Sequence, residues 1–167
     1  MAADVSDAPE LTGIGGAIRR VVVGIGADGR STVVRDEIAP HHYSHADYPG
    51  VTVTELWSLH AGDRLESEED VTGRRMGIRP NAPGESRYYS VRIEPGQDIP
   101  LHVTPTVDYH VCVAGEVTCV LETGEITVRA GDVVVVKGGP HGWRTAANAP
   151  YVSFAVMVGG PDSDVRE

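Results

Sequence analysis

The stretch GQDIPLHVTPTVDYHVCVAG, residues 96–115, decides the fold of this chain. Side chains of a strand alternate between its two faces, so Asp108, His110 and Cys112 are expected to project together. A carboxylate, an imidazole and a thiol are costly inside a barrel unless they meet a partner, and a metal ion or a polar ligand would supply one. The alternating residues are expected to cover the core from the opposite face: Tyr109, Val111 and Val113.

Short strands separated by regular turns are predicted around this stretch. Valine-rich segments bounded by glycine, proline and asparagine favour a sandwich or a barrel, and neither a long helix nor an internal repeat is visible. The fold class is therefore predicted to be all-β. The strands expected in this half of the chain are 86–94, 107–114, 116–122, 125–129, 132–136 and 151–158.

The first half of the chain is expected to add strands to that barrel. Residues 1–17 are predicted to be a flexible leader, 18–85 an N-terminal β extension with a loop, 86–160 the barrel, and 161–167 a tail. Within the extension, strands are expected at 18–24, 31–36 and 51–59.

Two features of the extension have competing interpretations. Gly24, Gly26 and Gly29 satisfy the G-x-G-x-x-G spacing, but a strand follows where a dinucleotide site needs a helix, so no nucleotide cofactor is expected. Residues 40–50 are predicted to be a loop whose histidines are solvated or lie at an interface, and 61–85 a long loop or lid.

Composition excludes several classes of partner. The chain has 167 residues and a formal charge of −10, whereas nucleic acid and anionic membranes both require a basic surface. No secretion signal and no apolar stretch long enough to cross a membrane are visible, so a cytoplasmic location is expected. Cys112 and Cys119 are expected to be buried, reduced thiols.

Gly96, His102, Thr104, Asp108 and Gly115 follow the spacing of the first cupin motif, G(X)5HXH(X)3–4E(X)6G. A second stretch, from Gly131 through His141 to Thr145, is similar to the second cupin motif, with the glycine and histidine one residue closer. The chain thus resembles a small, single-domain member of the cupin superfamily. The resemblance implies a double-stranded β-helix, or jelly-roll barrel, with its site in the mouth, and a homodimer.

Two ligand positions depart from the motif, because Thr104 replaces the usual second histidine and Asp108 the usual glutamate. The set that remains is His102, Asp108 and His141, a two-histidine, one-carboxylate group that suits Fe(II) and would also accept Zn(II), Mn(II) or Ni(II). A divalent metal is therefore predicted, with a metal-free site as the alternative. His110 is predicted to be a fourth ligand or, with Asp108, an acid–base group.

Three functions remain open. The first is a metal-dependent, non-redox lyase, isomerase or cyclase that decarboxylates, dehydrates or cyclises an organic acid or a polyketide-like metabolite. The second is an Fe(II) dioxygenase, and the third is a barrel that binds a ligand without turnover. In each case the partner is a small molecule, and its predicted contacts are Arg87, Tyr89, Thr104, Cys112 and Trp143.

Overall fold

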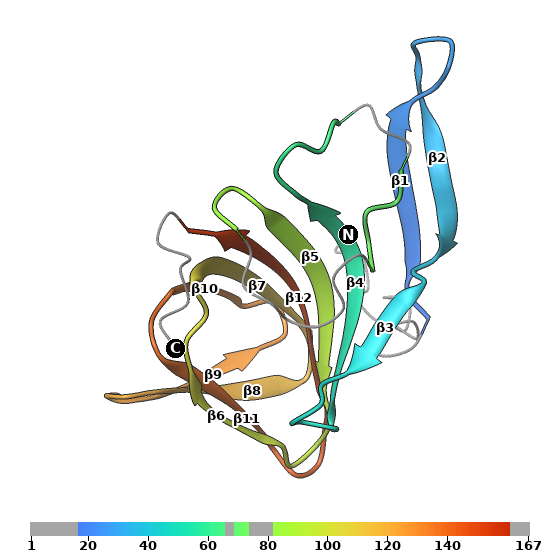
Figure 1. Ribbon diagram of the computed structural model, residues 1–167. Helices are drawn as coiled ribbons and strands as arrows, with labels where there is room; N and C mark the ends of the chain where they lie inside the picture. Colours follow the sequence, from blue (N-terminus) through green and yellow to red (C-terminus); the bar gives the residue numbers. More distant parts are fainter. Residues whose placement is uncertain (1–16, 66–68, 74–81, 161–167) are drawn as a thin grey trace, which may run out of the picture.

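The computed structural model describes residues 17–65, 69–73 and 82–160, and these residues form strands and turns without a helix (Figure 1). None of them therefore forms a helix of the length and apolarity that a membrane crossing needs. The strands are β1 (Arg19–Ile25), β2 (Ser31–Ile38), β3 (His41–Ser44), β4 (Val51–Leu59), β5 (Ser86–Ile93), β6 (Asp98–His102), β7 (Thr106–Ala114), β8 (Glu116–Leu121), β9 (Gly124–Arg129), β10 (Val133–Lys137), β11 (His141–Thr145) and β12 (Tyr151–Gly159).

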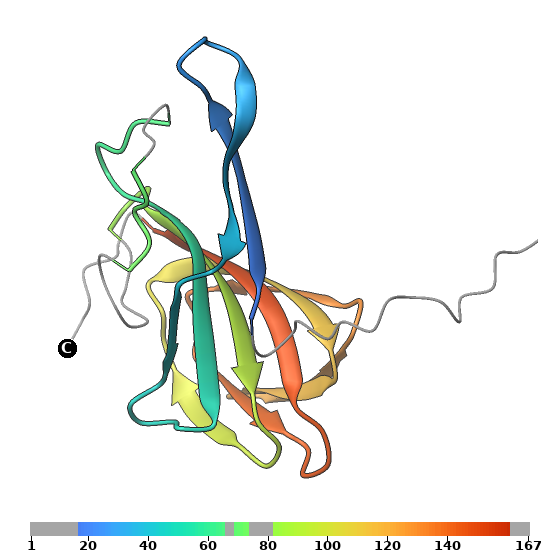
Figure 2. The same cartoon turned by 90° about the vertical axis from the view of Figure 1, so that its right-hand side faces the viewer.

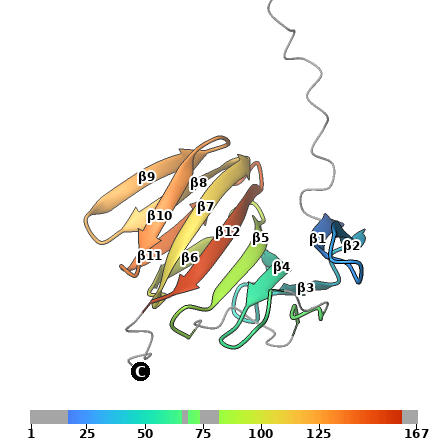
Figure 3. The ribbon, with the colours of Figure 1, turned by 90° about the horizontal axis from the view of Figure 1, so that it is seen from above.

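Two antiparallel sheets face each other and form the barrel (Figure 3). The larger sheet has the order β10-β7-β12-β5-β4-β3, and the smaller has the order β6-β11-β8-β9. Apolar side chains from both sheets fill one part of the space between them, among them Val53, Ile93, Val117 and Trp143. The prediction of an all-β jelly-roll barrel is confirmed.

The N-terminal extension divides into two parts. Strands β3 and β4 join the edge of the larger barrel sheet, whereas β1 and β2 form a separate hairpin that projects from the barrel (Figure 2). Arg20 of β1 anchors this hairpin to the rest of the chain. Its buried guanidinium pairs with Glu37 within the hairpin and with Asp70 outside it, and it donates a hydrogen bond to the carbonyl oxygen of Leu56 in β4.

Three strands, β3, β6 and β11, were not predicted from the sequence. Residues 41–44, predicted to be part of a loop, form strand β3 against β4. Strands β6 and β11 were missed because each is short and contains a residue typical of turns, Pro100 in β6 and Gly142 in β11. Proline is tolerated in β6 because that strand is the edge of its sheet.

The assignment of faces on β7 was wrong. Asp108, His110 and Cys112 do share a face, but that face points into the barrel, while Tyr109 and Val111 are 50% and 45% exposed on its outside. Alternation defines two faces without saying which is inside. Here the inner face is polar because it borders a cavity as well as the packed core.

The loop predicted at 61–85 is only partly described, since residues 66–68 and 74–81 lie outside the described ranges. Its described residues form turns without strands, and none of them lines the barrel cavity. Asp70 and Thr72 instead contact Arg20 of the hairpin. The leader 1–16 and the tail 161–167 also lie outside the described residues.

Candidate functional site

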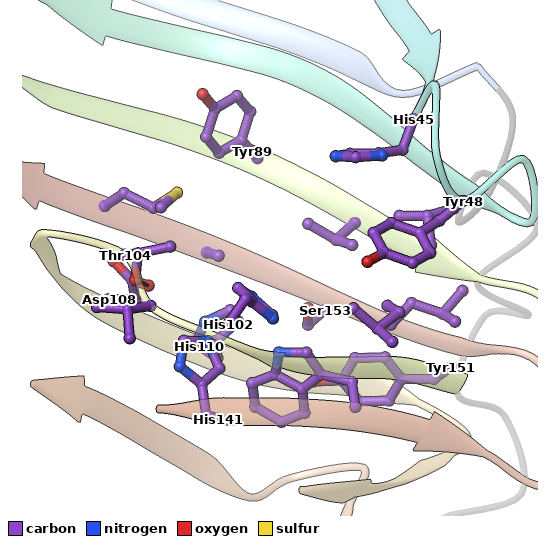
Figure 4. Close-up of a pocket in the computed structure, with 18 of the residues that line it drawn as sticks. His45, Tyr48, Tyr89, His102, Thr104, Asp108, His110, His141, Tyr151 and Ser153 are labelled. Atoms are coloured by element: carbon purple, nitrogen blue, oxygen red, sulfur yellow. Dashed lines mark hydrogen bonds between the residues drawn. The ribbon is translucent and has the colours of Figure 1, made fainter. Parts of the chain in front are cut away.

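A cavity of about 300 Å³ opens between the two sheets of the barrel (Figure 4). Five polar side chains gather at one end of it, contributed by β6, the turn after it, β7 and β11: His102, Thr104, Asp108, His110 and His141. Most of the remaining wall is apolar or aromatic. The cavity therefore combines a cluster of polar groups with a wall suited to a carbon skeleton.

Two threonines hold the buried carboxylate of Asp108. The Thr104 hydroxyl donates a hydrogen bond of 2.9 Å to Oδ2, and the Thr106 hydroxyl donates one to Oδ1. Asp108 is only 2% exposed, so these hydroxyls replace the water that the carboxylate loses on burial. The threonine at the usual position of a second histidine thus orients the carboxylate.

The rings of His102 and His141 lie side by side on the paired strands β6 and β11, with centroids 4.4 Å apart and planes tilted by 52°. Each ring places Nδ1 near a backbone carbonyl oxygen, at 3.0 Å from Pro100 for His102 and at 2.9 Å from Gly139 for His141. A carbonyl only accepts, so Nδ1 carries the proton in both rings. In the neutral form of such a ring, Nε2 has the lone pair and can accept a hydrogen bond.

The three predicted metal ligands are brought to the same end of the cavity but do not complete a metal site as they are arranged. Both oxygens of Asp108 accept hydrogen bonds from threonines, and His102 and His141 each contact a backbone carbonyl oxygen through Nδ1. Across the described ranges no three His, Cys, Asp or Glu side chains are grouped so as to hold a metal ion.

His110 lies in the middle of the polar cluster, on the same face of β7 as Asp108. Its ring centroid is 5.3 Å from the centroid of Trp143, and the residue is half-buried in the wall of the cavity. Burial lowers the pKa of His110 to about 4; the nearby Asp108 carboxylate opposes this shift and His141 adds to it. Burial also lowers the pKa of His141. Both rings are therefore neutral at pH 7.

The predicted substrate contacts divide into two groups. Tyr89, Thr104 and Trp143 line the cavity. Arg87 and Cys112 are buried but are not part of its wall. The guanidinium of Arg87 donates a hydrogen bond of 3.0 Å to the hydroxyl oxygen of Tyr89, and the Tyr89 side chain in turn lines the cavity.

Cys112 instead belongs to the packed core and lies near the carbonyl oxygens of Ala114 and Gly115. Cys112 and Cys119 are both free and buried, as predicted, and burial raises the pKa of each thiol. A raised pKa disfavours the reactive thiolate, so neither cysteine is suited to be a nucleophile.

The sequence analysis missed His45 and Tyr48, which lie in the turn between β3 and β4. Both line the cavity, with ring centroids 4.9 Å apart (Figure 4). The expectation of a purely solvated or interface loop was therefore wrong for His45. No local signal marks these residues, because they reach the cavity only through the pairing of β4 with β5.

The strand β12 also contributes to the wall along much of its length. Four alternating residues face the cavity, namely Tyr151, Ser153, Ala155 and Met157. The strand was predicted, but its side chains were not considered as site residues, because an apolar strand pattern with one serine is typical of a core strand.

The barrel is similar to several known proteins. Residues 89–158, from within β5 to within β12, match the cupin domain. The phomopsin biosynthesis cluster protein D of Diaporthe leptostromiformis is 36% identical over 77 residues, which cover 46% of this chain and 39% of that protein. A cupin-domain-containing oxidoreductase of Aspergillus ruber is 24% identical over 137 residues, covering 80% of this chain and 66% of that protein.

A solved structure, the polyketide cyclase RemF from Streptomyces resistomycificus, has 17% identity and a TM-score of 0.47, with 65% of this chain and 64% of that chain covered. The chain thus spans less than two thirds of the curated relatives and of this structure.

Proposed function

We propose, from the match of residues 89–158 to the cupin domain and from the cavity, that the chain is an enzyme that moves protons on a small organic molecule held in the barrel. The reaction class is that of a lyase, isomerase or cyclase. One observation carries the proposal: His110, held neutral by burial, borders a mostly apolar cavity beside the Asp108 carboxylate.

His110 is the proton acceptor in this proposal. A neutral imidazole takes a proton from a C–H or O–H group of the substrate, and the nearby carboxylate stabilises the imidazolium that forms. Asp108 is positioned for this by its two threonine hydrogen bonds. The Nε2 atoms of His102 and His141 accept hydrogen bonds from substrate hydroxyl groups and orient the substrate.

The cavity wall favours a neutral, ring-containing substrate over an organic acid. Among the described residues that line it there is no lysine and no arginine, so a buried carboxylate on the substrate would lack a cationic partner. Tyr48 and Trp143 instead present aromatic rings, against which a planar ring packs favourably. The volume of about 300 Å³ lies at the small end of the range for ligand pockets.

Proton transfer can be tested without knowing the natural substrate. 2-Tetralone is a neutral bicyclic ketone with exchangeable α-hydrogens, and mass spectrometry follows their replacement in deuterated buffer. The intact protein is expected to accelerate exchange well above buffer, and His110→Gln to remove at least nine tenths of the acceleration. His42→Gln, which removes an exposed histidine, is the matched control. Equal exchange with His110→Gln would contradict the role of His110.

Metal dependence is decided by elemental analysis of the protein purified without added metal. The name of the Aspergillus relative suggests oxidoreductase chemistry as the competing proposal. Stoichiometric iron together with oxygen consumption that His102→Ala abolishes would replace proton transfer by the oxygenase. Binding of the ketone without any exchange would leave a barrel that only binds.

A further inference from the structure

Two residues of β12 that line the cavity carry buried hydroxyl groups without a hydrogen-bond partner in the protein. Tyr151 and Ser153 both line the cavity and are 2% and 1% exposed. Neither the Tyr151 Oη nor the Ser153 Oγ makes a hydrogen bond with another group of the protein. Buried polar atoms nearly always have a partner, so these two atoms are positioned for a group that the protein itself does not supply.

The surroundings of these hydroxyls are otherwise apolar. Tyr151 belongs to the packed core, and burial raises the pKa of Tyr151 to about 12. The Ser153 hydroxyl lies near enough to offset part of that rise, but the two oxygens do not reach hydrogen-bond geometry. Tyr151 is therefore a neutral phenol whose O–H group is free to donate.

The register of β12 against β7 locates this pair relative to the reacting end. Met157 lies opposite Asp108, Ala155 opposite His110, and Ser153 opposite Cys112. A strand advances about 3.3 Å per residue, so Ser153 lies about 7 Å along the strand from the level of His110. Figure 4 shows Ser153 and Tyr151 on the side of the cavity away from Thr104 and Asp108.

We propose that Tyr151 and Ser153 form a polar subsite that binds a hydroxyl or carbonyl oxygen at the non-reacting end of the substrate. The identity of the reacting end rests on the proposed function of His110. A span of about 7 Å, or slightly more, corresponds to two oxygens on opposite ends of a fused two-ring system. The substrate class is thus a neutral bicyclic phenol or ketone with oxygens at both ends.

Calorimetric titration with two naphthalene probes tests the subsite. 2,6-Dihydroxynaphthalene carries oxygens at both ends, whereas 2-naphthol carries one. The intact protein is expected to bind the diol about tenfold more tightly, the value of one additional hydrogen bond. Tyr151→Phe is expected to reduce this ratio to near one without changing the affinity for 2-naphthol, and Ser153→Ala to reduce it in part.

A stability measurement separates a ligand contact from a structural one. Removal of an unpartnered hydroxyl costs the free protein nothing, so the melting temperature of Tyr151→Phe is expected to equal or exceed that of the unchanged chain. A clear drop would mean that the hydroxyl is bonded within the protein, and it would overturn the proposal.

Failure of the subsite and failure of the proposed function give different results. His110→Gln is expected to keep the preference for the diol while losing deuterium exchange into 2-tetralone. A preserved preference without exchange in the unchanged chain would refute proton transfer and leave the subsite standing. Equal affinity for the two probes, or no binding of either, would overturn the subsite.

Discussion

The neutrality of His110 makes the stability of this protein depend on pH in a calculable way. The pKa of His110 falls from 6.5, its usual value, to about 4 in the folded chain. The unfolded chain therefore binds a proton at this site more readily than the folded chain as the pH falls below 6.5. Proton binding to the unfolded chain draws the equilibrium toward unfolding. The stability is complete above pH 6.5 and is lost as the pH falls toward 4.

The size of the effect follows from these two pKa values. Between pH 7.5 and pH 5.0, the free energy of unfolding is expected to fall by about 2 kcal/mol because of His110 alone, and the loss levels off near 3 kcal/mol below pH 4. His141 titrates in the same direction, since its pKa is lowered too. The unchanged chain and His110→Gln both contain His141. The difference between their unfolding free energies therefore removes the contribution of His141 to a first approximation.

Denaturant unfolding at the two pH values provides the assay. The unchanged chain is expected to lose about 2 kcal/mol more than His110→Gln between pH 7.5 and pH 5.0. His42→Gln removes an exposed imidazole and is expected to behave like the unchanged chain. An equal loss in the unchanged chain and in His110→Gln would refute the neutrality of His110, and with it the basis for a proton acceptor in the cavity.

Three further changes test the framework around the site. Gly142→Ala places a Cβ 2.7 Å from a backbone oxygen of β6 and is expected to cost about 2 kcal/mol in urea unfolding, whereas Gly139→Ala, where a Cβ meets nothing within 4 Å, is the control. Arg20→Ala removes the anchor of the β1–β2 hairpin and is expected to cost about 2 kcal/mol, with faster amide hydrogen exchange in the hairpin than in the barrel. Cys112 and Cys119 are expected to resist alkylation by iodoacetamide at pH 7.5 until the chain is unfolded, as read by mass spectrometry; rapid labelling of the native protein would contradict their burial.

Local signals predicted most of the barrel and one end of its cavity. Alternation placed Asp108 and His110 on one face of β7, and motif spacing brought His102 and His141 to the same end of the cavity. These properties depend on neighbours in the sequence or on fixed intervals, so the sequence carries them directly.

The rest of the site depends on contacts between distant residues. His45 reaches the cavity because β4 pairs with β5, and the sequence around it has the composition of an exposed loop. Which face of β7 points inward depends on the sheet opposite. The threonines that hold Asp108 give no signal of their own, because threonine is common in any strand.

The unpartnered hydroxyls on β12 connect the structure of the cavity to its selectivity. A strand whose alternate residues were all apolar would fill this wall more simply, since a buried hydroxyl without a partner lowers stability. The presence of Tyr151 and Ser153 is therefore explained if the cavity binds its ligand through polar groups at both ends and aromatic rings between them. A ligand that satisfied only the histidine end would leave those hydroxyls buried without a partner, and such a penalty discriminates more strongly than the addition of an apolar contact. The same two positions that weaken the empty protein are thus the ones expected to set which molecules reach His110.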